Sequence, residues 1–278
     1  MYVDVHCHLD EEVLAKDLDK IMFECKDKNV VAVITHGTSP KSNRDTLKIA
    51  KKYGIVKAAL GIYPIEAIQK EGYDAKKQFL QEYGVNALTE KRINDEFEKR
   101  FMSLIAKEID FIRQNKDKIV AIGEVGLDLY WTDSLRFQKY VFERMIELSL
   151  ELNLPIVVHC RNAEQQVFDI LQKKKAKKVV IHCYGGPLDI AQKMIDAGYY
   201  FTIPANVVRS KKVQKLVELL DISRIMTETD SPCLAPDPKK TNYPYNVIYS
   251  VKKIAELKGL TIDETKNIIY MNYQKLFL

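Results

Sequence analysis

The run Pro155–His159 (PIVVH) decides the fold, because it is short, continuously apolar and rich in β-branched residues. Such a run, without the alternation of a half-exposed strand, is typical of a strand buried on both faces of a parallel sheet. A stripe of apolar residues at helical spacing precedes it: Phe137, Val141, Met145, Leu148 and Leu152. These residues therefore predict a helix followed by a buried parallel strand.

Seven further runs of the same kind recur along the chain: Tyr2–His6, Val30–His36, Val56–Gly61, Ile119–Glu124, Val179–His182, Tyr199–Ile203 and Ile225–Glu228. Eight strands that alternate with amphipathic helices over this length predict an α/β fold, the closed (β/α)8 TIM barrel. An open, doubly wound sheet is the alternative. Near the end of the chain, Thr261 and Glu264 have the spacing of a capping box and predict the start of a helix.

The whole chain, residues 1–278, is predicted to form one barrel domain. One connection is unusually long, and residues 66–90 within it are charged and interrupted by Gly72 and Gly84. We expect this stretch to be a surface insertion between the third strand and the third barrel helix. The apolar positions from Ile93 to Ile112 predict that helix.

The composition is that of a globular protein, with 46% hydrophobic and 29% charged residues. No apolar run reaches the length of a membrane span, and the first residues lack the pattern of a signal peptide. The five cysteines are an odd number without a CxxC pair, which fits a reducing compartment. We therefore expect a cytoplasmic protein without a membrane partner.

The formal net charge of +5 and the isoelectric point of about 8.7 are mildly basic. They fall short of the strong positive bias of a dedicated nucleic-acid-binding protein. This charge is compatible with a phosphate-bearing substrate and does not by itself indicate one.

Six polar residues stand at or just after predicted strand ends: His6, His8, Glu124, His159, His182 and Asp230. Each has an ordinary structural explanation when taken alone, such as a helix cap or a turn residue. In a barrel, however, the carboxyl ends of the strands converge on one mouth, where the active site lies. The six together therefore predict a metal site.

Imidazoles and carboxylates suit divalent cations, and a carboxylate can bridge two of them. We expect one ion on His6, His8 and Asp230 and the other on His159 and His182, with Glu124 as the bridge. Two such ions can activate a shared water and stabilise the attacking and leaving oxygens. Asp230, at the edge of the metal site, can accept the proton of that water.

Five motifs carry a family resemblance: Asp4–Leu9 (DVHCHL), Gly123–Asp128 (GEVGLD), His159–Ala163 (HCRNA), His182–Gly186 (HCYGG) and Thr227–Pro236 (TETDSPCLAP). In this order, over nearly the whole chain, they resemble the TatD family of metal-dependent deoxyribonucleases. The resemblance implies an amidohydrolase-type TIM barrel with two divalent metals, Zn²⁺, Mg²⁺ or Mn²⁺. It also implies cleavage of DNA phosphodiester bonds, frequently from the 3′ end. Carried over by position, it gives the same six ligands and makes Arg161 a phosphate contact.

The chain departs from the family in Gly61–Glu66 (GIYPIE), where the family usually has Gly-x-His-Pro-His. Tyr63 and Ile65 stand in place of the two histidines, which affects the substrate pocket more than the metals. We assign Tyr63 to substrate binding. His36, the one histidine without a family role, either compensates for Tyr63 or is a structural residue at the barrel rim, and we favour the second.

The leading hypothesis is a deoxyribonuclease, a 3′–5′ exonuclease on single-stranded or frayed DNA ends, acting through a metal-activated hydroxide. Glu124 and Asp230 are the predicted catalytic residues. The alternative is a two-metal hydrolase of carbonyl or ester bonds in a small amide, a lactone or an aminoacyl-tRNA. A third hypothesis is a metal-binding or nucleic-acid-binding protein without turnover. The oligomeric state is not predicted.

Overall fold

The computed structural model describes residues 1–64, 87–130 and 135–278, with side chains of the long helix described from residue 99 onward. Eight strands follow one another in the sheet in chain order, each parallel to the next. They are β1 (Tyr2–Cys7), β2 (Val30–His36), β3 (Val56–Leu60), β4 (Ile119–Asp128), β5 (Ile156–Arg161), β6 (Val179–Ile181), β7 (Tyr200–Ile203) and β8 (Ile225–Thr227). This order contradicts the doubly wound alternative.

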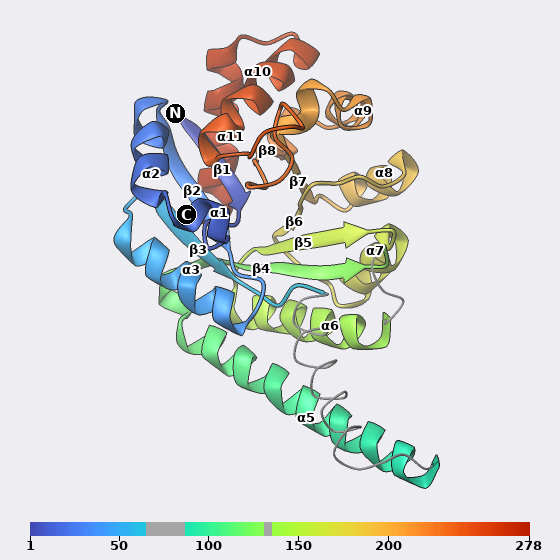
Figure 1. Ribbon diagram of the computed structural model, residues 1–278. Helices are drawn as coiled ribbons and strands as arrows, with labels where there is room; N and C mark the ends of the chain where they lie inside the picture. Colours follow the sequence, from blue (N-terminus) through green and yellow to red (C-terminus); the bar gives the residue numbers. More distant parts are fainter. Residues whose placement is uncertain (65–86, 131–134) are drawn as a thin grey trace.

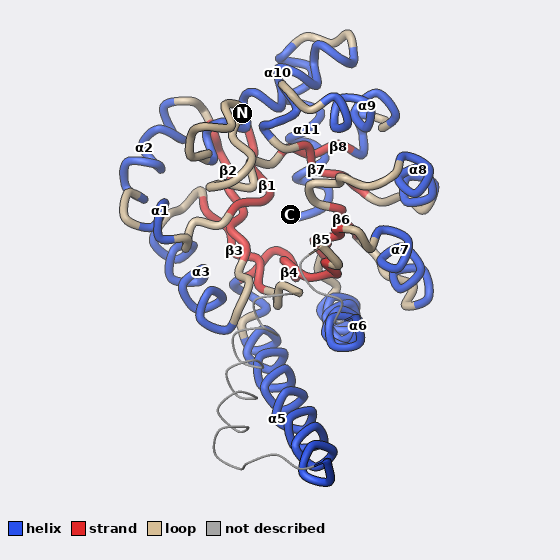
Figure 2. The backbone as a smooth tube through the Cα atoms, turned by 45° about the vertical axis from the view of Figure 1, so that its right-hand side comes forward, coloured by secondary structure: helices blue, strands red, loops and turns tan. Residues whose placement is uncertain are grey.

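Helices lie between the strands and surround them on the outside (Figures 1 and 2). They are α1 (Glu12–Ala15), α2 (Leu18–Asp27), α3 (Pro40–Lys52), α5 (Ala87–Gln114), α6 (Leu135–Leu152), α7 (Glu164–Lys173), α8 (Leu188–Asp196), α9 (Lys211–Leu219), α10 (Val247–Lys258) and α11 (Ile262–Phe277). Short 3₁₀ turns occur at Lys116–Lys118, Ala205–Val208, Ile222–Arg224 and Pro244–Asn246. The outer end of α5 extends away from the barrel in both views.

The barrel closes between β1 and both the end of β8 and the segment that follows it. The Thr227 hydroxyl donates a hydrogen bond to the carbonyl of Val3 (2.7 Å), and the Asp230 amide donates to the carbonyl of His6 (2.9 Å). The His8 amide returns a bond of 2.8 Å to the carbonyl of Ser231. The predicted TIM barrel is confirmed, and its closure places Asp230 beside the first strand.

The strand interiors are buried as their apolar runs predict, and most bounds agree with the prediction within two residues. β4 is the exception, because it continues past Glu124 to Asp128. The predicted stripe of α6 faces the core, and Thr261 forms the predicted capping box with Glu264.

The predicted insertion at residues 66–90 lies largely outside the described residues, and residues 87–90 belong to α5. The predicted helix from Ile93 to Ile112 is within α5. In the described part of the chain, no helix is both long and apolar enough to cross a membrane.

Candidate metal centre

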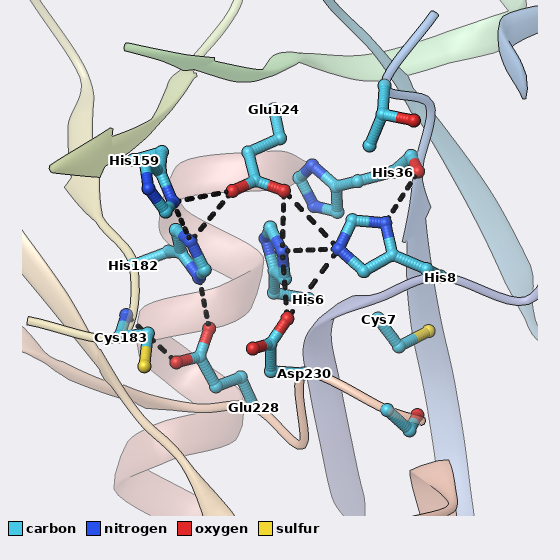
Figure 3. Close-up of polar contacts among 12 residues, drawn as sticks. His6, Cys7, His8, His36, Glu124, His159, His182, Cys183, Glu228 and Asp230 are labelled. Carbon is cyan, nitrogen blue, oxygen red and sulfur yellow. Dashed lines mark hydrogen bonds and ion pairs between the residues drawn. The ribbon is translucent and has the colours of Figure 1, made fainter. Parts of the chain in front are cut away.

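The six predicted ligands come together at the carboxyl ends of the strands (Figure 3). His6 lies in β1 and His8 follows that strand, so both side chains point to one side, as period two requires. Glu124 lies in β4 and His159 in β5, while His182 directly follows β6 and Asp230 follows β8. Five separate strands therefore contribute to a single cluster.

Glu124 is the centre of the cluster, because each of its two carboxylate oxygens faces a different pair of histidines. Oε2 lies 3.4 Å from Nε2 of His6 and 3.3 Å from Nε2 of His8. Oε1 lies 2.9 Å from Nδ1 of His159 and 2.9 Å from Nε2 of His182. The carboxylate thus divides the cluster into two groups of donor atoms.

The first pocket consists of His6, His8, Asp230 and Oε2 of Glu124. Oδ1 of Asp230 lies 3.6 Å from Nε2 of His6 and 3.5 Å from Nε2 of His8, and these two nitrogens are 3.3 Å apart. Two ligands about 2.1 Å from an ion, at a tetrahedral angle, are about 3.4 Å apart. The donor spacing of the first pocket therefore fits a divalent cation.

The second pocket consists of His159, His182 and Oε1 of Glu124. Its two donor nitrogens are 3.1 Å apart, and each lies 2.9 Å from the shared oxygen. Ligands about 2.1 Å from an ion at right angles to one another are about 3.0 Å apart. The second pocket is therefore also spaced like three ligands of one cation.

The hydrogen bonds behind the second pocket assign the protons of its imidazoles. Nε2 of His159 lies 3.1 Å from Oδ2 of Asp128, and Nδ1 of His182 lies 3.3 Å from Oε2 of Glu228. Because ionised carboxylates only accept hydrogen bonds, we assign the N–H to these ring nitrogens. The opposite nitrogens then face Oε1 of Glu124, where each can bind a proton or a cation.

Behind the first pocket, the rings of its two histidines contact a backbone carbonyl and other imidazole rings. Nδ1 of His8 lies 3.1 Å from the backbone carbonyl of His36, which leaves its Nε2 free as a ligand. The ring of His6 is stacked between the rings of His36 and His182, with centroid distances of 4.1 and 3.9 Å. Nδ1 of His6 is buried and has no hydrogen-bond partner among the described residues.

The pKa shifts of Glu124 and His182 reflect attraction between the carboxylates and imidazoles of the cluster. Burial alone would raise the pKa of Glu124, but the neighbouring His182 and His6 outweigh it and hold that pKa well below its usual value. Burial opposes charge on His182 as well, yet Glu124 and Glu228 raise its pKa well above the usual value. Within the described residues, the ion-pair partners of Glu124, Glu228 and Asp230 are histidines, so the donor set fits cations.

The backbone of β4 explains how two carboxylates reach the same site. Glu124 and Asp128 are four residues apart on one extended strand, so both point to the same face. Gly126 between them has φ of +147°, and a Cβ there would lie 1.9 Å from the carbonyl oxygen of His159. Only glycine permits this close approach of β4 to β5.

Asp128 and Glu228 are site residues that the sequence reasoning did not assign. Gln138 holds the backbone of Asp128 by two hydrogen bonds. Its Oε1 accepts from the Asp128 amide (2.7 Å), and its Nε2 donates to the Asp128 carbonyl (2.9 Å). Glu228 accepts a bond of 2.9 Å from the Cys183 amide. Their signal was their period-two spacing from the ligands, Asp128 four residues after Glu124 and Glu228 two residues before Asp230.

A cavity of about 690 Å³ opens above the metal centre, and both predicted substrate residues line it. The Tyr63 hydroxyl donates to Oδ2 of Asp128 (3.2 Å), and the Tyr63 ring contacts the His159 ring edge-on at 4.9 Å. Arg161 is exposed at the rim, with its guanidinium carbon 3.8 Å from the centre of the Tyr130 ring. Tyr63 therefore faces the second pocket, and Arg161 faces the entrance.

His36 does not replace the missing family histidines. It is fully buried and is not among the described residues that line the mouth, so it does not reach a substrate there. Burial lowers the pKa of His36 to about 3, which keeps the ring neutral. The compensation hypothesis is therefore wrong, while the structural interpretation agrees with this position.

Barrel enzymes have their active sites at the carboxyl ends of the strands. Histidines and carboxylates gathered there are typical of metal-dependent hydrolases. The family described as "TatD related DNase" matches residues 3–278 of this sequence. The chain belongs to this family of metal-dependent hydrolases.

Several relatives match over almost their whole length. Deoxyribonuclease TATDN3 of Homo sapiens is 33% identical, with 99% of this chain and 94% of the relative covered. An uncharacterized metal-dependent hydrolase of Methanocaldococcus jannaschii is 32% identical, with 99% and 96% covered. The crystal structure of YJJV, a TatD homolog from Escherichia coli, has a TM-score of 0.80 at 21% identity, with 99% and 97% covered. This last comparison supports the barrel fold.

Proposed function

We propose that this protein is a deoxyribonuclease that hydrolyses phosphodiester bonds of DNA with two divalent cations, removing nucleotides from the 3′ end of single-stranded or frayed DNA. The observation that carries the proposal is the position of Glu124, whose two oxygens each complete a separate pocket of donor atoms. The relative named a deoxyribonuclease supports DNA as the substrate. The ions proposed are Zn²⁺, Mg²⁺ or Mn²⁺.

When bound, two divalent cations lower the pKa of a shared water and neutralise the charge of the phosphate. The protein's own side chains accept the proton of the water and orient the residues that would bind the cations. Asp230 has a side chain that is 18% exposed at the edge of the first pocket, so its second oxygen can accept a proton from the attacking water. Asp128 and Glu228 keep the imidazoles of His159 and His182 in the tautomer that binds a cation.

The mouth supports a terminal nucleotide as the group that is bound. Its volume of about 690 Å³ lies within the range of small-molecule sites. Arg161 at the rim offers a planar, permanently charged fork suited to a phosphate. Tyr63 presents a ring and a hydroxyl that donates to Oδ2 of Asp128, and the Tyr130 amide donates to Oδ1 of the same carboxylate at 2.9 Å.

The second candidate function is hydrolysis of a carbonyl or ester bond. The observation in its favour is Tyr63, which stands where the family's first histidine is expected and whose hydroxyl is bound to Asp128. A pocket wall of this kind offers fewer cationic groups to a phosphate than two histidines would. The same activated water attacks a carbonyl carbon as well as phosphorus.

Incubation of purified protein with oligonucleotides and Mg²⁺, Mn²⁺ or Zn²⁺ tests the proposal. A 5′ label should yield a ladder that shortens from the 3′ end, faster on single strands and frayed duplexes than on blunt duplexes. His6→Ala should abolish cleavage, whereas Glu151→Gln, on the outer surface, should leave it unchanged. Absence of cleavage by the wild type, or equal cleavage by His6→Ala, contradicts the proposal, and turnover of an ester or lactone panel would then support the second candidate.

A further inference from the structure

His36 is a fully buried histidine at the end of β2 that has no place among the metal ligands. It lies next to the first pocket and not in the mouth above it (Figure 3). Buried histidines are uncommon without a partner or a task, because their ring nitrogens lose their hydrogen bonds to water. The contacts of this residue indicate such a task.

The ring of His36 joins β1 and the ligand His6. Nε2 lies 3.1 Å from the carbonyl oxygen of Val5, and because a carbonyl only accepts, this nitrogen carries the proton. The same ring is stacked on the ring of His6, with centroids 4.1 Å apart and an angle of 26° between the planes. One side chain therefore holds the backbone before His6 and also the face of the His6 ring.

The backbone at the end of β2 holds the other ligands of the first pocket. The His36 carbonyl accepts a hydrogen bond of 3.1 Å from Nδ1 of His8, which directs Nε2 of His8 into the pocket. The carbonyl of the next residue, Gly37, accepts a bond of 3.3 Å from the Glu124 amide. Residues 36 and 37 thus contact His6, His8 and Glu124 without binding a cation themselves.

The position of His36 costs free energy, because its other ring nitrogen is left without a hydrogen bond in the described part of the chain. Nδ1 is buried and has no hydrogen-bond partner among the described residues. It faces Gly123, where a Cβ would lie 3.1 Å away, so the strand next to Glu124 fits closely against this edge of the ring. An apolar residue of similar size would avoid the unpaired acceptor, but it would also lose the bond to Val5.

We propose that His36 is a positioning residue of the first pocket, whose ring fixes His6 in the orientation that binds a cation while its backbone carbonyl orients His8. The inference rests on the proposed two-cation function and deepens it, because it gives the two pockets separate supporting residues. His36 acts only through the ligands that it contacts. Loss of its ring should therefore weaken cation binding in the first pocket more than in the second, because the ring contacts His6 directly.

Titration of the metal-stripped protein with MnCl₂ in a calorimeter tests this role in two backgrounds. His159→Ala leaves the first pocket, and His8→Ala leaves the second. His36→Leu should weaken Mn²⁺ binding about 10–100-fold in the His159→Ala background, the size typical of residues that orient ligands. In the His8→Ala background the loss should be clearly smaller, because the His36 ring contacts His6 and Val5 and not the imidazoles of the second pocket.

Two further variants separate positioning from general stability. His36→Gln can still donate to the Val5 carbonyl and should recover part of the affinity that His36→Leu loses. Val33→Ala removes a buried side chain from the opposite face of the same strand and should leave Mn²⁺ binding intact. Thermal unfolding of the metal-free proteins establishes that each variant is folded.

Equal losses in both backgrounds, unchanged affinity in His36→Leu, or an equal loss in Val33→Ala would overturn the inference. Wild-type protein that binds Mn²⁺ but cleaves no DNA would overturn the proposed nuclease function and leave the role of His36 standing.

Discussion

The first and second pockets share Glu124, but they are supported by different kinds of groups. Behind the first pocket, His8 bonds to a backbone carbonyl and His6 stacks on a neutral ring. Behind the second pocket, His159 and His182 bond to the buried carboxylates Asp128 and Glu228. The first pocket instead has a carboxylate in direct contact, that of Asp230.

We propose that this difference gives the two pockets different tasks. Carboxylates behind an imidazole make it a stronger ligand and fix its orientation, so the second pocket is suited to hold a cation firmly. Asp230 is partly exposed to the mouth, so the first pocket is suited to exchange a proton with the reacting water. The predictions below test this division, from the largest effect to the smallest.

Glu124→Ala should have the largest effect, because it removes a donor from both pockets at once. We expect cleavage to fall by more than about 100-fold, beyond the range typical of changes outside the ligand set. Both Mn²⁺ binding events should weaken together. Cleavage assays and calorimetry check this, with Glu151→Gln as the surface control. Loss of only one binding event would mean that the carboxylate is not shared.

Asp128→Asn should separate the pockets, since the amide can offer N–H to Nε2 of His159 and reverse its tautomer. Mn²⁺ binding to the second pocket should weaken about 10–100-fold, and binding to the first pocket should not change. The backgrounds His8→Ala and His159→Ala isolate the two pockets for calorimetry. A loss confined to the first pocket would reverse the division proposed above.

Lower pH should weaken cation binding in both pockets, because the imidazoles must be unprotonated to bind. Nearby carboxylates outweigh burial and raise the pKa of His8 in the first pocket and of His182 in the second. Protons therefore compete already above pH 6.5, and affinity should fall up to about tenfold per pH unit for each proton displaced. Calorimetry between pH 8 and 6 measures this fall in affinity. An affinity that stays constant over this range would contradict competition by protons.

Arg161→Ala should weaken substrate binding without changing either pocket. One charge-assisted contact to phosphate is worth about 1.5–3 kcal/mol, so kcat/KM should fall about 10–100-fold. Arg161→Lys should recover only part of this loss, because an ammonium does not form the planar fork. If Mn²⁺ affinity falls in parallel, Arg161 supports the metal centre and not the phosphate.

Tyr63→Phe should have the smallest effect, because it removes one of several hydrogen bonds to Asp128 and keeps the ring. We expect a change of about 2–10-fold in second-pocket affinity, at the low end for residues that orient ligands, because His159 and the Tyr130 amide still hold Asp128. Tyr63→His restores the family residue and should raise activity on DNA relative to esters. An unchanged ratio would show that Tyr63 does not set the substrate.

The sequence was sufficient for the barrel and for the six residues that gather at its mouth, since both depend on local patterns. Continuous apolar runs predict buried parallel strands, and polar residues at their ends predict a shared mouth. Asp128 was not assigned because β4 was expected to end at Glu124, whereas its pairing with β5 shifts register after Ile122 and then continues. Irregular pairing of this kind depends on the neighbouring strand.

The role of His36 could not be read from the sequence for a similar reason. Its contacts join the end of β2 to β1, and they depend on how two rings stack inside the barrel. A pattern within one strand shows that a side chain points inward. The same pattern does not show which other ring that side chain contacts.

The number of cations bound per chain tests the central claim most directly. Metal-stripped wild-type protein, His8→Ala and His159→Ala are equilibrated with Mn²⁺ and the bound ions are counted. Two pockets that share Glu124 predict two ions, one ion and one ion, respectively. A single ion in the wild type, or the loss of both ions in either variant, would contradict the account.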